Sequence, residues 1–180
     1  MFEFVPHTDF RSAAADVLRR AERATLEALV DPLTGLNNRR AWDTLLATEE
    51  ARCRRYGHPA CVIAIDLDGL KQVNDTHGHA AGDQLLRRAG QALARTCRAE
   101  DGLARVGGDE FAILAVETAL ADGQILLQRI ERVLGEAGVQ AATGIAARSV
   151  TGDMHAAWQA ANAAMYAARR AHRALSSGAI

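Results

Sequence analysis

The sequence predicts an α/β fold of the α+β kind, in which helices flank one mixed β-sheet with split βαβ connections. Three features predict it: apolar runs of strand length alternate with longer segments of helical period, two of these runs lie within hairpin distance, and the other two are reached through helices. The chain has 180 residues, of which 49% are hydrophobic and 24% charged, so it can bury one domain core and does not resemble a disordered chain.

The N-terminal segment predicts a helix over residues 10–30, because Val17, Ala21, Ala24 and Ala28 recur at helical spacing. The stripe covers fewer than about three heptads, so two interpretations stay open. The helix pairs with a second copy of the chain as a coiled coil, or it packs on its own domain.

Each later element follows from its own pattern. Asn38 is a suitable N-cap for the next helix. The run Ala60–Ile65 is continuously apolar, as in a strand buried on both faces, and Gly107-Gly108-Asp109-Glu110 has the length of a hairpin connection. The helices predicted after 10–30 are 39–56, 69–76, 80–97, 121–137 and 154–173, and the predicted strands are 60–65, 103–106, 111–116 and 139–147.

Charge and cysteine content argue against several classes of protein. The net charge is −1, from 21 basic and 22 acidic residues, so no overall field attracts nucleic acid or anionic lipid, and phosphate binding needs a local site. No apolar stretch approaches the ~18 residues of a membrane span, and residues 1–11 lack a signal-peptide pattern. Cys53, Cys61 and Cys97 form no CxxC pair, which favours buried, reduced thiols and a cytoplasmic location.

Two acids mark the end of the most apolar strand. Asp66 and Asp68 are two residues apart, so on a strand their side chains point to the same face. Two carboxylates held together resist ionisation, and a hard divalent cation such as Mg²⁺ relieves the repulsion. The alternative interpretation is a pair of solvated acids that cap the next helix.

Two further acids follow the glycines of the predicted hairpin. If the hairpin pairs beside the Ala60–Ile65 strand, Asp109 and Glu110 meet Asp66 in space. Carboxylates converging from separate segments are what a metal-dependent phosphoryl-transfer site needs. Taken alone, a Gly-Gly-Asp-Glu turn is an ordinary surface turn.

The segment between these acids carries groups suited to a nucleotide. Lys71 is the only lysine of the chain and can donate to a phosphate oxygen, while Asn74 and Asp83 can together recognise the edge of a guanine base. The alternative is that Asn74 ends one helix, Asp83 opens the next, and His77 and His79 are surface residues. A zinc site is disfavoured because no cysteine or third histidine lies nearby in the sequence.

Taken together, these segments resemble the GGDEF family of diguanylate cyclases. The signature is Gly107-Gly108-Asp109-Glu110-Phe111, and the other motifs occur in the family's order over roughly residues 31–173. These are Asp31-Pro32-Leu33-Thr34-Gly35-Leu36-Asn37-Asn38-Arg39, Asp66-Leu67-Asp68 with Lys71 and Asn74-Asp75, Gly78-His79 with Gly82-Asp83, and Arg105 before the signature.

The resemblance implies a ferredoxin-like sheet of the nucleotidyl-cyclase palm type, and condensation of two GTP molecules into cyclic di-GMP and pyrophosphate. It implies that Asp66, the Leu67 carbonyl and Asp109 hold Mg²⁺, or alternatively Mn²⁺, and that Asp68 is not a principal ligand. Asp109 would also activate the attacking hydroxyl, with Glu110 beside it. Lys71 would neutralise phosphate charge, and Asn74, Asp83 and His79 would line the nucleotide site.

The resemblance also implies contacts beyond the acids. Arg169 stands where the family has a phosphate-contacting Lys, and Arg173 matches a terminal Arg of the family. Arg98 and Asp101 match an R-x-x-D motif that binds the product and inhibits the enzyme; the alternative is an ion pair between them at a helix end.

The expected organisation is a linker or signalling helix over 1–30, a catalytic domain over 31–175 and a disordered tail over 176–180. Catalysis would require a homodimer, because each protomer holds one GTP, and a sensory partner would supply the input. The alternative function is an inactive GGDEF domain that binds GTP or cyclic di-GMP and signals through protein contacts.

Overall fold

The computed structural model describes residue 15 and residues 28–177, apart from the side chains of residues 173 and 175–177. Most of the helix expected over 10–30 and the last three residues of the tail expected over 176–180 therefore lie outside the described residues. In the part that is described, no helix is both long enough and apolar enough to cross a bilayer. The three cysteines are free thiols; Cys53 and Cys61 are buried and Cys97 is partly buried.

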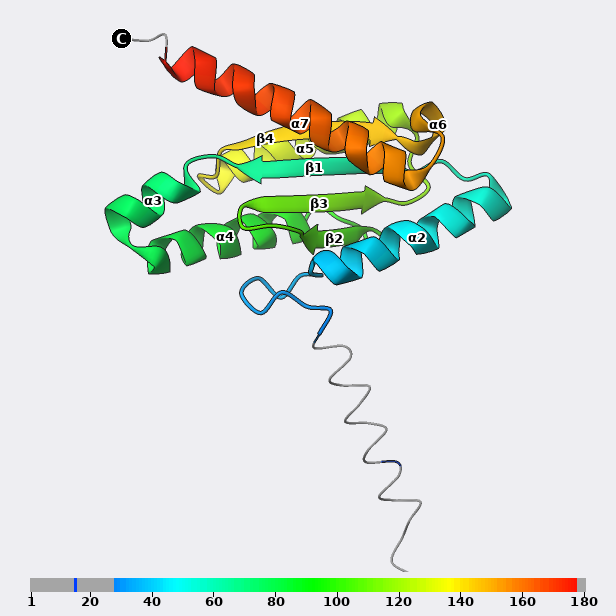
Figure 1. Ribbon diagram of the computed structural model, residues 1–180, viewed down its shortest axis with the longest axis horizontal. Helices are drawn as coiled ribbons and strands as arrows, with labels where there is room; N and C mark the ends of the chain where they lie inside the picture. The colour runs from blue at the N-terminus through cyan, green and yellow to red at the C-terminus, as the bar shows by residue number, and fades with distance from the viewer. Residues whose placement is uncertain (1–14, 16–27, 178–180) are drawn as a thin grey trace, which may run out of the picture.

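The predicted order of helices and strands is confirmed over the described residues (Figure 1). The largest shift is at the C-terminal end of the last helix, expected at residue 173 and found at 177, and one short helix, α6, was not predicted. The elements are α2 (Arg39–Tyr56), β1 (Cys61–Leu67), α3 (Leu70–His77), α4 (His79–Ala94), β2 (Gly102–Arg105), β3 (Glu110–Ala115), α5 (Leu120–Glu136), β4 (Ala141–Ala147), α6 (Arg148–Thr151) and α7 (Met154–Ser177).

The four strands form one sheet in the order β2-β3-β1-β4. The predicted fold class is confirmed, but every pairing in the sheet is antiparallel, whereas a mixed sheet was expected. The helical connection from β1 to β2 does return the chain in the same direction. The hairpin then inserts β3 between these two strands, so no parallel neighbours result.

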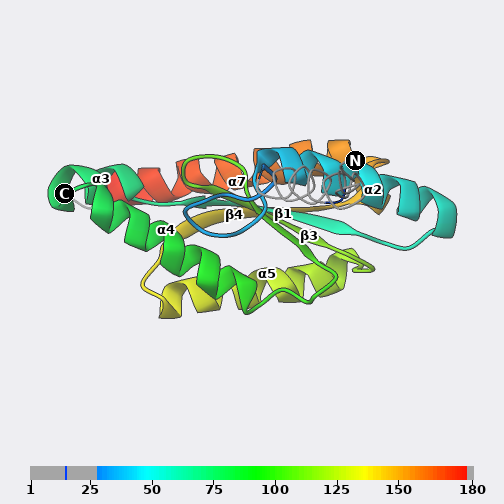
Figure 2. The same cartoon turned by 90° about the horizontal axis from the view of Figure 1, so that it is seen from below.

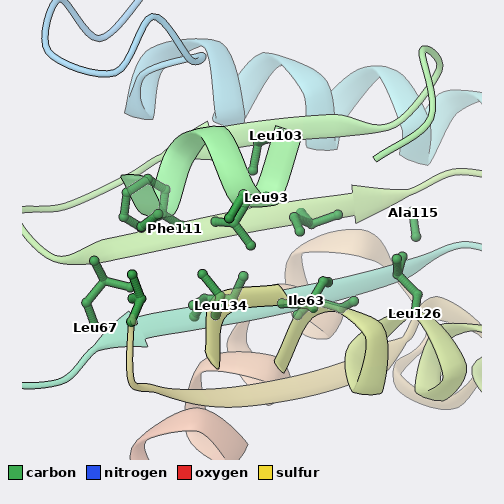
Figure 3. Packing of buried hydrophobic residues seen from close by; sticks show 14 of the residues in the cluster. Ile63, Leu67, Leu93, Leu103, Phe111, Ala115, Leu126 and Leu134 are labelled. Atoms are coloured by element: carbon green, nitrogen blue, oxygen red, sulfur yellow. The ribbon is translucent and has the colours of Figure 1, made fainter. Parts of the chain in front are cut away.

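Strand β1 is buried along its whole length and separates two layers of helices (Figure 2). Ile63 and Ile65 belong to the hydrophobic cluster formed with α4 and α5, part of which Figure 3 shows. Val62 and Ala64 belong to the cluster formed with α2 and α7. Because both faces are covered by apolar side chains, the strand is held rigidly and its C-terminal residues have a defined position.

Helix α7 lies very close to the sheet because β4 carries a glycine beneath it. A Cβ atom added to Gly144 would lie 2.3 Å from the carbonyl oxygen of Ala161 and 2.3 Å from the amide nitrogen of Met165. Only a residue without a side chain permits this approach of helix to strand. The contact fixes the height of α7 above β1, and therefore fixes which α7 side chains reach the end of β1.

Candidate active site

The acids predicted to converge do so at the C-terminal end of β1. The β1–β3 pairing sets Asp66 directly opposite Glu110, and the Leu67 amide donates a hydrogen bond of 3.0 Å to the Asp109 carbonyl oxygen. The hairpin turn and the start of α3 lie at this same end of the sheet (Figure 1). Backbone hydrogen bonds, rather than side-chain contacts, therefore bring the two acidic segments together.

The first motif of the chain supports the hairpin turn. Arg105 donates a hydrogen bond of 2.8 Å to the Gly108 carbonyl oxygen and forms an ion pair of 3.1 Å with Asp31. Burial raises the pKa of Asp31, but the hydrogen bonds from Thr34 and the Arg105 guanidinium outweigh burial, and the net pKa is lowered. Asp31 therefore stays ionised and, through Arg105, holds the turn that presents Asp109.

Asp66 is fully buried, and only one of its two carboxylate oxygens has a hydrogen-bond partner. Arg169 of α7 donates a hydrogen bond to its Oδ2 atom, whereas Oδ1 is buried and has no hydrogen-bond partner. A second Arg169 nitrogen, Nη2, lies 3.8 Å from Oδ2 of Asp109. One guanidinium thus approaches both carboxylates that were predicted to bind metal.

Two more α7 side chains contact acids of the same group. The Tyr166 hydroxyl donates a hydrogen bond of 2.6 Å to Oε1 of Glu110. This bond is the largest of the effects, burial among them, that together raise the pKa of Tyr166 to about 12. Nδ1 of His172 lies 3.4 Å from Oδ2 of Asp68. Asp66 and Asp68 therefore both meet α7, which confirms that their side chains share a face.

Burial and, next, the negative charge of Asp109 raise the pKa of Asp66, and the net value is about 6. Arg169 acts in the opposite direction but does not cancel these effects. A buried carboxylate with a raised pKa and an unpartnered oxygen is short of positive charge.

The oxygen atoms at this end of the sheet suit a divalent cation whose remaining coordination positions are filled by a bound ligand and by water. In the described part of the chain, no three His, Cys, Asp or Glu side chains form a group that holds a metal ion unaided. Asp66 and Asp109 supply two carboxylates, and the Leu67 backbone lies between them and could add its carbonyl. A site with few protein ligands is what Mg²⁺ prefers, because it keeps waters and takes phosphate oxygens.

A cavity of about 420 Å³ opens beside these acids at the start of α3. It has a volume usual for small-molecule sites. Two cations, Lys71 and Arg169, line it together with Asp109 and Asp75. The pairing of positive side chains with acids predicted to bind metal favours an anionic ligand such as a phosphate chain.

The residues expected to recognise guanine lie further along α3 and α4. The Asn74 Oδ1 atom is buried without a hydrogen-bond partner, and it packs so closely on Gly82 that an added Cβ there would lie 1.9 Å away. Asp83, the next residue, is partly buried, and His79 is exposed. The side chain of Arg173, also expected to bind substrate, lies outside what the structure describes.

Arg98 and Asp101 line a separate cavity with Arg129 and Asp122. The alternative ion pair between Arg98 and Asp101 does not form; instead the Asp101 carboxylate accepts the Arg98 amide at 2.8 Å and the Val116 amide at 3.2 Å. Within the described residues, the Arg98 guanidinium has no hydrogen bond or ion pair of its own. The carboxylate is thus fixed while the guanidinium is exposed.

Sequence reasoning missed Tyr166 and the ion pair of Arg169 with the acids. Both residues lie on a helix that is 50 or more positions from the acids they contact. A sequence signal that links the two is their spacing of three residues, which places them on one helix face.

Comparison with known proteins agrees with this fold. Residues 28–175 match the family described as "Diguanylate cyclase, GGDEF domain". The chain belongs to this family. The diguanylate cyclase DgcP of Pseudomonas aeruginosa is 36% identical over 156 residues, which are 82% of this chain and 23% of DgcP. The response regulator PleD of Caulobacter vibrioides is 40% identical over 121 residues, which are 67% of this chain and 27% of PleD.

Solved GGDEF structures have the same fold. The coiled coil and GGDEF domain of DgcB from Caulobacter crescentus, in complex with c-di-GMP, superposes with a TM-score of 0.82 at 29% identity, over 89% of this chain and 91% of that one. The diguanylate cyclase SiaD of Pseudomonas aeruginosa, in complex with its activator SiaC, superposes with a TM-score of 0.75 at 31% identity, over 89% of this chain and 66% of SiaD. This GGDEF chain spans about a quarter of the length of DgcP and of PleD.

The raised pKa of Asp66 predicts that metal-free protein becomes less stable as pH rises. Between the ordinary pKa of 3.8 and the folded-state pKa of about 6, the folded protein keeps a proton that the unfolded chain has lost. The free energy of unfolding therefore falls through this range, by roughly 3 kcal/mol from Asp66 alone. Denaturant titrations of native protein and Asp66→Asn at a series of pH values measure the difference.

Asp66→Asn has no group to titrate, so its stability should change less with pH across this range. Asp43→Asn is the control, because Asp43 is exposed on α2 and should leave the native dependence intact. Equal pH dependence of native protein and Asp66→Asn would contradict the interpretation.

Proposed function

We propose that this GGDEF domain is a diguanylate cyclase, which condenses two GTP molecules into cyclic di-GMP and two pyrophosphates with Mg²⁺ or Mn²⁺. The observation that carries the proposal is the juxtaposition of Asp66 and Asp109, with an unpartnered buried oxygen, beside a cavity lined by Lys71 and Arg169. Family membership adds support, since the match spans almost all of the described residues.

In each of the two steps, the 3′-hydroxyl of one GTP attacks the α-phosphorus of the other. A new oxygen–phosphorus bond forms, the bond to pyrophosphate breaks, and Asp109 takes part in removing the hydroxyl proton. Asp66, the Leu67 carbonyl and Asp109 would hold a divalent ion, and the bound ion would neutralise charge on the phosphate oxygens. Lys71 binds phosphate oxygens as a compact cation, and Glu110 is positioned beside Asp109 by Tyr166.

Guanine recognition is assigned to Asn74 and Asp83, with His79 beside the base. The carboxylate of Asp83 suits the N–H donors of guanine, whereas the corresponding ring nitrogen of adenine is an acceptor. The close packing of Asn74 on Gly82 holds its amide at the junction of α3 and α4. Arg173 is assigned to the phosphates of the same nucleotide.

Catalysis by this domain requires two copies of it. Each protomer has one such site, and a ring of two phosphodiester bonds needs two GTP molecules facing one another. We assign the segment 1–30 to pairing or positioning the protomers under control of a sensory partner, in the cytoplasm where GTP is available. The catalytic unit is assigned to residues 31–175.

A binding module is the alternative function, and one observation favours it. The Arg169 guanidinium already satisfies one oxygen of Asp66, so the site carries a cation of its own. A domain of this kind would bind GTP or cyclic di-GMP without turnover and would act through protein contacts.

Arg98 and Asp101 are proposed as a product site that inhibits the enzyme. The fixed carboxylate of Asp101 and the exposed guanidinium of Arg98 offer an acceptor and a bidentate donor to a guanine base or phosphate. Because Asp101 also holds the amide at the C-terminal end of β3, occupancy is linked to the strand whose other end carries Glu110.

The cyclase proposal predicts that purified protein with GTP and Mg²⁺ forms cyclic di-GMP and pyrophosphate, which chromatography of the products measures. Asp109→Ala should lower the rate by about 10²- to 10³-fold or more, because it removes a charge that acts on the reacting groups. Asp43→Ala, on the exposed face of α2, should keep the native rate. Native protein that binds cyclic di-GMP but forms none over a wide range of protein concentrations would overturn the proposal in favour of the binding module.

The product-site proposal predicts that Arg98→Ala weakens cyclic di-GMP binding by roughly tenfold to a hundredfold, the usual effect of losing a charged hydrogen bond. Isothermal titration calorimetry measures it. Arg87→Ala is the matched control, because Arg87 is an exposed arginine of α4 outside this cavity. Equal affinity of native protein and Arg98→Ala would refute the site.

A further inference from the structure

Helix α7 presents three hydrogen-bonding side chains to the acids of the site, each contacting a different acid. The three are spaced by three residues, so they share one face of the helix. They are Tyr166, Arg169 and His172, and they contact Glu110, Asp66 and Asp68 respectively. The acidic row is therefore already matched by a row of donors from the protein itself.

The central member of this row lies on both carboxylates assigned to the metal. Nη1 of Arg169 bonds to Oδ2 of Asp66, and Nη2 lies 3.8 Å from Oδ2 of Asp109. The Asp66 side chain is 0% exposed and that of Arg169 only 22%, so water screens the pair weakly. The positive charge of the guanidinium thus lies against the same two carboxylates to which a divalent ion would bind.

We infer that Arg169 is the counter-ion of the metal site while the site holds no metal ion. When the metal ion and the nucleotide bind, Arg169 leaves Asp66 and Asp109 and binds the phosphates of the nucleotide. The inference deepens the proposed function, on which its nucleotide part rests. An ion and a guanidinium compete for the same two carboxylates, because two cations this close repel each other.

The same side chain lines the cavity assigned to the triphosphate, together with Lys71 and Asp109. A guanidinium released from the carboxylates therefore has phosphate oxygens as its next partner, with bidentate geometry available. Metal ion and nucleotide must then strengthen each other's binding, because each favours the same released position of Arg169. Such coupling is reciprocal and typically amounts to about 5- to 150-fold in affinity.

Titration of Mn²⁺, followed by electron paramagnetic resonance, tests the inference without any turnover. Native protein, Arg169→Met and Arg170→Met are compared in mildly alkaline buffer, which keeps Asp66 ionised. Without nucleotide, Arg169→Met should bind Mn²⁺ about tenfold more tightly than native protein, because the competing cation is gone. Arg170→Met is the matched control, since Arg170 is an exposed neighbour on α7 and should leave the affinity at the native value.

A non-hydrolysable GTP analogue should raise Mn²⁺ affinity strongly in native protein and less in Arg169→Met, because that variant has already lost the competitor. Arg169→Lys retains a charge on a shorter side chain and should fall between the two; it decides the matter if Arg169→Met does not fold, as judged by circular dichroism. Native-like or weaker Mn²⁺ binding by the folded variants, without nucleotide, overturns the inference.

The cyclase proposal and this inference fail in different ways. Native protein that forms cyclic di-GMP, with variants that bind Mn²⁺ as native protein does, refutes the counter-ion role alone. Tighter Mn²⁺ binding by Arg169→Met in a protein that forms no cyclic di-GMP upholds the counter-ion role and refutes the cyclase proposal.

Discussion

The antiparallel pairing of β1 with β3 is the constraint on which the rest of the site depends. It places Asp66 opposite Glu110 and ties the Leu67 amide to Asp109, so like charges are held together by backbone hydrogen bonds. A slip of one residue in this register would turn the acids of one strand to the opposite face. The apolar burial of β1 on both sides prevents such a slip, because its core residues would also be displaced.

The electrostatic repulsion that this pairing creates is balanced from the other layer of the fold. Helix α7 approaches the sheet at Gly144, and this contact sets how far Tyr166 and Arg169 extend toward the acids. The chain has an alanine-rich α7, which allows the helix to pack closely on the sheet along much of its length. The close packing of small residues between α7 and β4 thus determines which side chains balance the charge of the acids on β1 and β3.

Local features of the site could be predicted from the sequence, whereas its long-range contacts could not. The strand before Asp66, the hairpin at Gly107-Gly108 and the shared face of Asp66 and Asp68 follow from apolar runs, turn residues and the period of a strand. The antiparallel sheet and the bonds from Tyr166 and Arg169 depend on how distant elements pack. A single sequence carries no local pattern for such contacts, and this is also why Arg169 was assigned to phosphate alone.

The most direct test of the account is a crystal structure of the protein with Mn²⁺ and a non-hydrolysable GTP analogue, in which anomalous scattering locates the ion. We expect an ion about 2.1 Å from an oxygen of Asp66 and from an oxygen of Asp109, with the triphosphate as a further ligand. An ordered nucleotide in the α3 cavity whose ion touches neither carboxylate would contradict it.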